Sequence, residues 1–216
     1  LRLLVLDGLE PLQIVSIRMI LAALFIAPFF IRKMKKHSFY EHGFSFLLIG
    51  LLNTALPFTM FAYASVSLGA GSLSILQATV PILTALILFT LYKGEFSYFK
   101  LSGVMIGFAG LFLLVGPSGN LDLFASILCV VASLSYAIAG VYLAKTPTRI
   151  SNSFIGMGSI IVGAFLMAPF LLNYANPFTT ISATSWLYLA LLGVVNTSLA
   201  YVIFIKLIKR IGPINS

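Results

Sequence analysis

The sequence has few charged residues and almost no cysteine. Only 8% of its 216 residues are charged, whereas 60% are hydrophobic, and the mean hydropathy is +1.09. A soluble protein of this size needs more charge to cover its exterior, so the excess apolar surface has to face lipid. The single cysteine, Cys129, excludes a disulfide framework within the chain.

Acidic residues are also scarce, at 5 against 13 Lys and Arg, and the net charge is +8. The basic residues form short clusters between apolar runs, with no basic face and no interleaved aromatic residues, which argues against nucleic-acid binding. The sequence contains no phosphate-binding loop, dinucleotide fingerprint, nucleophile elbow or metal-ligand spacing. We therefore predict no catalytic residue, no metal and no cofactor.

A short pattern occurs twice within the apolar sequence. Gly-Leu-Leu-Asn-Thr at residues 50–54 returns as Gly-Val-Val-Asn-Thr at residues 193–197, 143 positions later and without a gap. Ala-Pro-Phe at residues 27–29 returns at residues 168–170, at the nearly equal offset of 141. The chain therefore contains a duplicated hydrophobic unit, which is typical of membrane transporters built from structural repeats.

Seven apolar stretches are long enough to cross about 30 Å of hydrocarbon as helices. They cover residues 11–31, 43–66, 71–92, 99–117, 121–144, 152–173 and 184–206. We predict an all-α, polytopic bundle integral to the membrane, with one repeat at residues 1–118 and the other at residues 119–216. Short loops make successive helices antiparallel, and Asn53 and Asn196 lie on spans five apart. The two repeats should therefore cross the membrane in opposite directions.

The basic residues are sorted by loop. Eleven of the thirteen fall in alternate loops, which the positive-inside rule assigns to the cytoplasm; they are Arg32, Lys33, Lys35, Lys36, Lys93, Lys100, Lys145, Arg149, Lys206, Lys209 and Arg210. A soluble helical protein has no reason for this sorting. We predict a multi-pass protein of the cell membrane whose Lys- and Arg-rich loops are cytoplasmic.

Several of these segments resemble one transporter family. The stretch from Gln-Ala-Thr-Val-Pro at 77–81 through Tyr-Lys-Gly-Glu at 92–95 to the glycine-rich residues 103–110 is similar to EamA-type transporters of the drug/metabolite transporter superfamily. The resemblance implies ten helices in two inverted five-helix repeats and the transport or export of small metabolites. On this interpretation the chain starts near the end of helix one and stops at the start of helix nine, so we expect it to be a piece of a longer protein.

Arg18 is the costliest residue for a membrane span. It lies about 10 Å along its helix, and a charge there costs a few kcal/mol unless it faces a cavity or a partner. One interpretation is that Arg18 binds an anionic group of a substrate. The other is that it extends to the outer interface, toward Asp7 or Glu10.

Gln77 and Pro81 form a second candidate. Pro81 has no N–H, so the carbonyl of Gln77 loses its helical partner and creates a polar position within a span. Such a position can bind a solute, or it can be a kink that serves packing alone.

Asn53 should have the same property, because Pro57 follows it at the same spacing. Asn196 has Ala200 there, so we expect a normal helix around it. The two asparagines can bind a polar solute or can form hydrogen bonds between helices. Tyr136 is deep enough in its span to line a cavity, whereas the other tyrosines lie nearer the span ends.

The leading hypothesis is a secondary carrier that works by alternating access, with Arg18, Asn53, Gln77, Tyr136 and Asn196 in a substrate-binding role. Its partners would be a small solute and the lipid bilayer, and the oligomeric state stays open, a homodimer included. A membrane enzyme acting on lipid would need a catalytic constellation that the sequence does not contain. A structural or sensory bundle without a pathway would use both asparagines for hydrogen bonds between helices.

Overall fold

The computed structural model describes residues 2–34, 36–91, 98–115, 122–145, 152–174, 181–200 and 202–203. Helices account for nearly all of these residues, and none of them forms a strand. The elements in chain order are α1 (Arg2–Leu6), α2 (Pro11–Lys33), α3 (Lys36–Gly50), η1 (Leu51–Ala55), α4 (Leu56–Ser67), α5 (Ala70–Gln77), α6 (Val80–Leu91), α7 (Tyr98–Val115), α8 (Leu123–Lys145), α9 (Asn152–Met167), η2 (Ala168–Asn173), α10 (Ala183–Ala190) and η3 (Leu191–Leu199).

Five helical stretches among the described residues are long and apolar enough to cross a membrane, which confirms the polytopic helical bundle. They are Pro11–Arg32, His42–Ser67, Ala70–Leu91, Leu123–Lys145 and Phe154–Asn173. A shorter apolar helix covers Ala183–Leu199. The predicted spans 99–117 and 184–206 both extend beyond the described residues, which end at Val115 and Ile203 there.

The chain divides into two compact units, each described by itself. Unit 1 consists of Leu1–Val5 and Leu56–Pro147, and unit 2 of Leu6–Ala55 and Thr148–Ser216. Each unit combines segments from both halves of the sequence. A compact unit is therefore not the same as a sequence repeat, and the repeat boundaries and their inverted orientation stay predictions.

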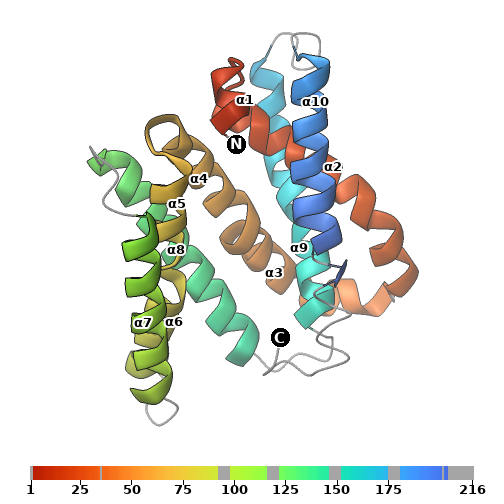
Figure 1. Cartoon of the computed structure of the whole chain (residues 1–216). Coiled ribbons are helices and arrows are strands. Elements are labelled where there is room, and N and C mark those ends of the chain that lie inside the picture. Colours follow the sequence, from red (N-terminus) through yellow and green to blue (C-terminus); the bar gives the residue numbers. More distant parts are fainter. Residues whose placement is uncertain are drawn as a thin grey trace. The chain divides into compact units, whose positions relative to one another are not determined.

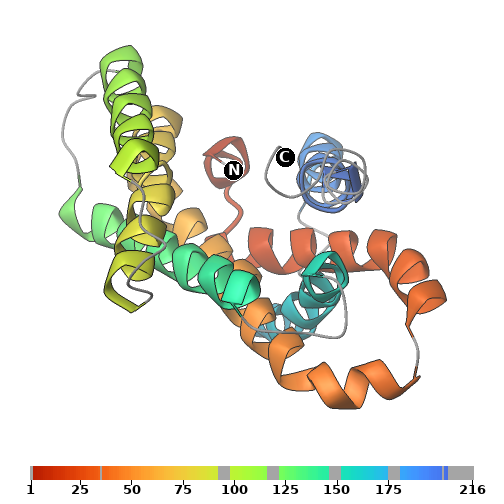
Figure 2. The same ribbon diagram turned by 90° about the horizontal axis from the view of Figure 1, so that it is seen from below.

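Unit 2 is built around the pair α2 and α9. The two helices pack along each other, η3 packs on α2, and α3 and η1 pack on α9; Figure 2 shows this grouping. Phe30, Phe46 and Phe154 form an aromatic cluster, in which the rings of Phe30 and Phe154 stack at 4.6 Å. Gly158 makes room for it, because a Cβ there would lie 2.5 Å from the Phe46 ring.

Unit 1 is built around α8, which packs against α4, α5 and α6 (Figure 1). Its core consists mainly of small side chains on α4 and α8, which let the two helices approach closely; the core residues are Phe61, Ala64, Leu68, Ala125, Cys129 and Ala132. Helix α7 packs on α5 and α6.

Large apolar side chains are exposed on many helices, among them Leu24 on α2, Leu86 on α6 and Phe165 on α9, which are 67%, 55% and 80% exposed. Such surface is unfavourable in water and is expected where a helix faces lipid. Most of the predicted cytoplasmic residues, including Lys93, Arg149 and residues 206–210, lie outside the described part of the chain. The orientation in the membrane therefore stays a prediction.

Candidate functional site

The structure distributes the five predicted site residues over both units. Arg18 on α2, Asn53 on η1 and Asn196 on η3 belong to unit 2, whereas Gln77 at the end of α5 and Tyr136 on α8 belong to unit 1. Arg18 is only 7% exposed. Asn53 and Tyr136 are half-buried, and Gln77 and Asn196 are exposed. That the five residues line one cavity stays a prediction.

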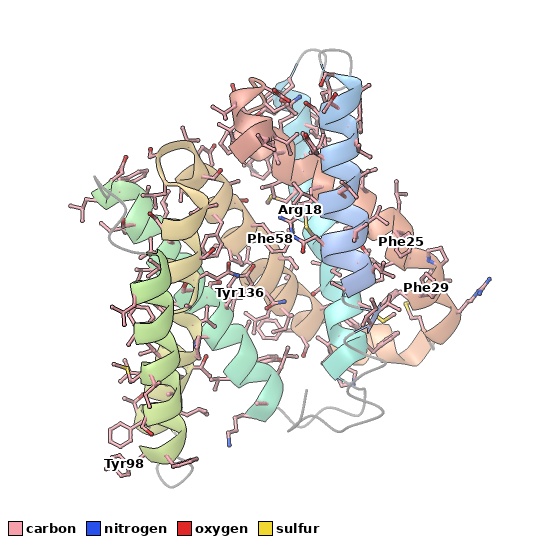
Figure 3. The ribbon with its side chains drawn as sticks, in the orientation of Figure 1. Arg18, Phe25, Phe29, Phe58, Tyr98 and Tyr136 are labelled. Atoms are coloured by element: carbon pink, nitrogen blue, oxygen red, sulfur yellow. The ribbon has the colours of Figure 1, made fainter. Side chains whose placement is uncertain are left out.

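The guanidinium of Arg18 is bound by a residue of the second motif copy. Its Nε and Nη2 atoms donate to Thr197 Oγ1 at 3.2 and 3.0 Å, and Figure 3 shows where Arg18 lies on α2. The Thr197 hydroxyl donates in turn to the carbonyl of Leu192 at 2.8 Å. One hydroxyl proton and two lone pairs are the full capacity of this oxygen, so these three bonds fix its role as the acceptor for Arg18.

The two carboxylates that precede α2 bind hydroxyl groups. Ser185 Oγ donates to Asp7 Oδ2 at 2.7 Å, and Tyr174 Oη donates to Glu10 Oε2 at 2.9 Å. These bonds connect the start of α2 to the ends of η2 and α10. Arg18 is buried at the α2–η3 contact, so the interpretation that it extends to the membrane interface does not describe this structure.

The asparagine and threonine of both motif copies lie in π-helical segments, whereas Gly50 is the last residue of α3. Asn53 lies in η1 and Asn196 in η3. The expectation of a normal helix around Asn196 is wrong, because the wider turn forms there without a proline. A π turn carries backbone hydrogen bonds from residue i to i−5, and the side-chain hydroxyl of Thr197 also reaches the carbonyl five residues earlier, that of Leu192. Single π turns occur frequently at functional sites.

The glycine of each motif marks a close approach to a facing helix. A Cβ on Gly193 would lie 2.6 Å from the carbonyl oxygen of Arg18 on α2, and a Cβ on Gly50 would lie 3.3 Å from the carbonyl oxygen of Ser159 on α9. Glycine is required wherever backbones approach this closely. Each motif is therefore pressed against one of the two central helices of unit 2.

The residues contacted by the two glycines are equivalent in the sequence. The same glycines also approach Leu21 and Val162, whose Cβ atoms would lie 3.1 and 2.9 Å away. Ser159 and Val162 follow Arg18 and Leu21 at the same offset of 141 that relates the two Ala-Pro-Phe segments. The two motif contacts are thus built alike, on positions that the sequence repeat relates.

The asparagine side chains take no part in the hydrogen bonds of these contacts among the described residues. Neither Asn53 nor Asn196 donates or accepts a side-chain hydrogen bond with another described residue. The buried polar contacts come instead from the threonine that follows each asparagine. Thr54 Oγ1 donates to the carbonyl of Gly50 and, at 3.3 Å, to that of Ser159. In both motif copies, therefore, the threonine and not the asparagine forms a hydrogen bond to the facing helix.

In unit 1 the span Ala70–Leu91 is interrupted near Pro81, as predicted. Helix α5 ends at Gln77 and α6 begins at Val80. The carbonyl of Leu76 accepts hydrogen bonds from the Thr79 hydroxyl at 2.6 Å and from Ser133 Oγ of α8 at 3.1 Å. A hydrogen bond therefore connects the interrupted segment to α8. The Gln77 side chain, at the end of α5, is exposed.

Tyr136 lies one turn beyond Ser133 on α8. Its ring stacks on Phe61 of α4, with 6.2 Å between centroids and 25° between planes; Figure 3 shows it within unit 1. The tyrosine thus covers the core of unit 1 and is only half-buried.

Sequence reasoning missed two hydroxyl-bearing residues, Thr197, which binds Arg18, and Ser133, which binds the interrupted span near Pro81. Thr197 and Ser133 were not considered as partners of Arg18 and of the Pro81 break. For Thr197 the signal was present, because threonine follows asparagine in both motif copies. For Ser133 no signal existed, since a contact 57 residues apart cannot be read from spacing within one helix.

Comparisons with known proteins place the chain in a family. The model of the EamA-like transporter family matches residues 2–116 and 123–216. An uncharacterized transporter of Bacillus subtilis (strain 168), YoaV, is 24% identical over 214 residues, which cover 94% of this chain and 72% of YoaV.

A protein of known crystal structure has a similar fold, with a TM-score of 0.63 and 15% identity over 86% of this chain. The chain spans 66% of that protein's length. Five helices among the described residues are long and apolar enough to span a membrane, and the family model matches nearly all of the sequence; this integral membrane protein belongs to the EamA-like transporter family.

Proposed function

We propose that the protein is a secondary transporter, and not an enzyme, that exports small metabolites across the cell membrane by alternating access. The family match and the relative YoaV support membrane transport. The observation that carries the proposal further is Arg18, a charged residue that is only 7% exposed within an apolar span. A charge in a span is expensive and is kept where a substrate or ion pathway needs it.

The two repeats of the proposal are residues 1–118 and 119–216, in inverted orientation, with the Lys- and Arg-rich loops in the cytoplasm. The equivalent contacts of Gly50 and Gly193 support a common origin of the two motif segments. Inverted repeats allow two halves to exchange conformations and to open a central site to each side in turn. A homodimer stays part of the proposal.

The substrate-binding residues of the proposal are Arg18, Asn53, Gln77, Tyr136 and Asn196. Two features support this assignment. The asparagines and Gln77 form no side-chain hydrogen bond to another described residue, which leaves their amides available for a solute. The interrupted span at Gln77 is the kind of discontinuous helix that forms binding sites in transporters.

The test is a transport assay with the full-length protein in liposomes. Vesicles are given a bacterial metabolite extract, and their contents are measured by mass spectrometry for the wild type, Gln77→Ala, Asn196→Ala and the control Ser102→Ala. Ser102 is exposed on α7 and bonds only its own helix, to Phe99 at 2.9 Å.

We expect wild-type and control vesicles to accumulate the same solutes and the two site variants to accumulate less. If both variants transport as well as the wild type, the assignment of Gln77 and Asn196 to the substrate site is refuted. If the wild type accumulates no solute, the transporter hypothesis is refuted and a structural or sensory bundle is favoured.

A further inference from the structure

We propose that Ser133 of α8 is a positioning residue for Gln77, because its hydroxyl holds the end of α5 where the span Ala70–Leu91 is interrupted. The inference rests on the proposed transport function and on the place of Gln77 in its substrate site. It adds a residue that neither the sequence pattern nor the family resemblance assigns.

The proline explains why the span is interrupted but not where its first piece lies. Pro81 has no N–H, so the carbonyl of Gln77 has no donor four residues later. In the turn between α5 and α6, the N–H of Thr79 donates to the carbonyl of Leu76 at 3.2 Å, only three residues earlier. The Thr79 hydroxyl donates to the same carbonyl at 2.6 Å. Both bonds are local, and neither sets the position of α5 relative to another helix.

A further bond to this carbonyl comes from another helix. Ser133 Oγ donates to the carbonyl of Leu76 at 3.1 Å, across 57 residues of sequence. A helical serine or threonine can reach a carbonyl one turn earlier in the chain, and Ser126 and Thr84 do so, at 2.8 Å each. Ser133 instead bonds α5, which packs on α8 (Figure 1). Its side chain is completely buried, so water does not compete for this bond.

The part of α8 that supplies Ser133 belongs to the core of unit 1. Ala132 is a member of the core cluster, and Tyr136 stacks on Phe61 of α4. The side chain of Leu76 packs against the same cluster. The end of α5 is therefore held twice, by the Leu76 side chain in the core and by the Leu76 carbonyl on Ser133.

Gln77 is the residue that this anchor places. It follows Leu76 directly and ends α5, and its side chain is exposed and forms no hydrogen bond to another described residue. A glutamine side chain has several rotatable bonds, so fixing the backbone at its base limits the positions that its amide can take. Order that exists before binding does not have to be created by the ligand. Loss of the Ser133 bond should therefore weaken solute binding without removing a group that binds.

The experiment makes two measurements on the full-length protein in liposomes. Uptake is recorded with a bacterial metabolite extract as the probe at graded dilutions, and mass spectrometry gives an apparent KM and a maximal rate for each accumulated solute. Hydrogen–deuterium exchange is measured on peptides that cover residues 74–84, which include the interruption.

The variants are Ser133→Ala, Ser133→Thr, Gln77→Ala and the double variant that combines Ser133→Ala with Gln77→Ala. Ser126→Ala is the matched control, because it removes a serine hydroxyl of the same helix that bonds the carbonyl four residues earlier.

Ser133→Ala should raise the apparent KM about fivefold, with a maximal rate within about twofold of wild type, because one ordering hydrogen bond is lost while the binding groups remain. Exchange in residues 74–84 should accelerate about fivefold for the same reason. Ser133→Thr keeps the hydroxyl and should restore both values, and Ser126→Ala should change neither. The double variant should have the KM of Gln77→Ala alone, since Ser133 acts through Gln77.

A KM for Ser133→Ala equal to that of Ser126→Ala would overturn the inference while transport stands, and so would increases in KM that multiply in the double variant. Unchanged exchange in Ser133→Ala would show that the bond does not hold the interruption, which overturns the inference as well. If threonine is too large for the buried position, Ser133→Ala and Ser126→Ala still decide between these outcomes. Uptake of no solute by the wild type would refute the proposed function and this inference with it.

Discussion

The two copies of the Gly-x-x-Asn-Thr motif are built alike and used differently. In each copy a glycine presses a π-helical segment against a central helix of unit 2, η1 on α9 and η3 on α2. In the first copy the threonine bonds backbone carbonyls only, whereas in the second Thr197 binds the guanidinium of Arg18. A duplicated scaffold thus carries a charged group on one side alone.

The comparison separates packing from chemistry. What the copies share, the close glycine and the buried threonine, is needed to hold two helices together in lipid, where small residues and hydrogen bonds drive association. The residue that differs between the two copies is the candidate for a functional role. Arg18 stands where Ser159 stands in the other copy, and this difference introduces a buried charge into one of two similar contacts.

The largest expected effect comes from removing that difference. Arg18→Met keeps an unbranched apolar chain of similar length, and we expect transport at low solute concentration to fall about a hundredfold, the value of a charged hydrogen-bonding partner. Thermal stability should be unchanged or higher, because a buried charge is costly to the fold. The measurements are liposome uptake and the thermal midpoint in detergent. A large loss of stability with uptake retained would make Arg18 structural.

A smaller effect is expected where the two copies agree. Alanine at Gly193 would place a Cβ 2.6 Å from the Arg18 carbonyl oxygen, and alanine at Gly50 would place one 2.7 Å from a methyl group of Val162. Each change should lower the free energy of unfolding by about 2 kcal/mol through overpacking. Gly193→Ala should cost more, because backbone yields less easily than a side chain. Gly103→Ala, with nothing near it, is the control; equal stability of all three variants would contradict the close approach.

One hydrogen bond is present in the second copy alone. Ser198 Oγ donates to the carbonyl of Ala22 at 2.7 Å, and the equivalent residue of the first copy is Ala55. Ser198→Ala should lower the free energy of unfolding by about 1 kcal/mol, because a buried hydroxyl bond is lost. Chemical-denaturation midpoints of this variant and of Ser102→Ala, which removes an exposed hydroxyl, would measure the difference. No change relative to that control would show that this bond does not stabilise the second copy.

The smallest effect concerns a helix end away from both copies. The backbone N–H of Ala125 donates to Asp122 at the start of α8, and with the Ser67 hydroxyl it holds the pKa of the Asp122 carboxyl below its ordinary value of 3.8. A lowered pKa stabilises the folded state above pH 3.8, and this contribution is lost as the pH falls through the lowered pKa.

Asp122→Ala should therefore slightly lower the unfolding midpoint at pH 7 and remove part of the decline that the wild type shows in acid. Helix α10, which is capped by the uncharged Ser182, provides the comparison, because Ser182→Ala should lower the midpoint equally at both pH values. Parallel pH curves for wild type and Asp122→Ala would contradict the cap.

Sequence reasoning predicted the spans well, because a helix that crosses lipid must be a long apolar run and loops must carry the polar residues. The break at Pro81 was also predictable, since a missing N–H has a fixed consequence for the helix. The π turn at Asn196 was not. No proline stands near it, and the segment packs through Gly193 on α2, which lies more than 170 positions away in the sequence.

The candidate site was predicted by residue type and not by partner. A charged residue in a span is conspicuous in any sequence, so Arg18 was found. Its partner Thr197 was not, because threonine is common in spans and its importance depends on the packing of η3 on α2. The division into two compact units was not predictable either. The boundary between the units lies within the continuous span His42–Ser67, where the amino-acid composition does not change.

The most direct test of the account is a double-mutant cycle on the KM for uptake, with Arg18→Gln, Thr197→Val and the two combined. If Thr197 acts by orienting Arg18, the double variant should have the same KM as Arg18→Gln alone, because the threonine has nothing left to position. If the two increases in KM multiply instead, Thr197 contributes independently of Arg18, and the claim that the second motif copy holds an oriented cation is contradicted.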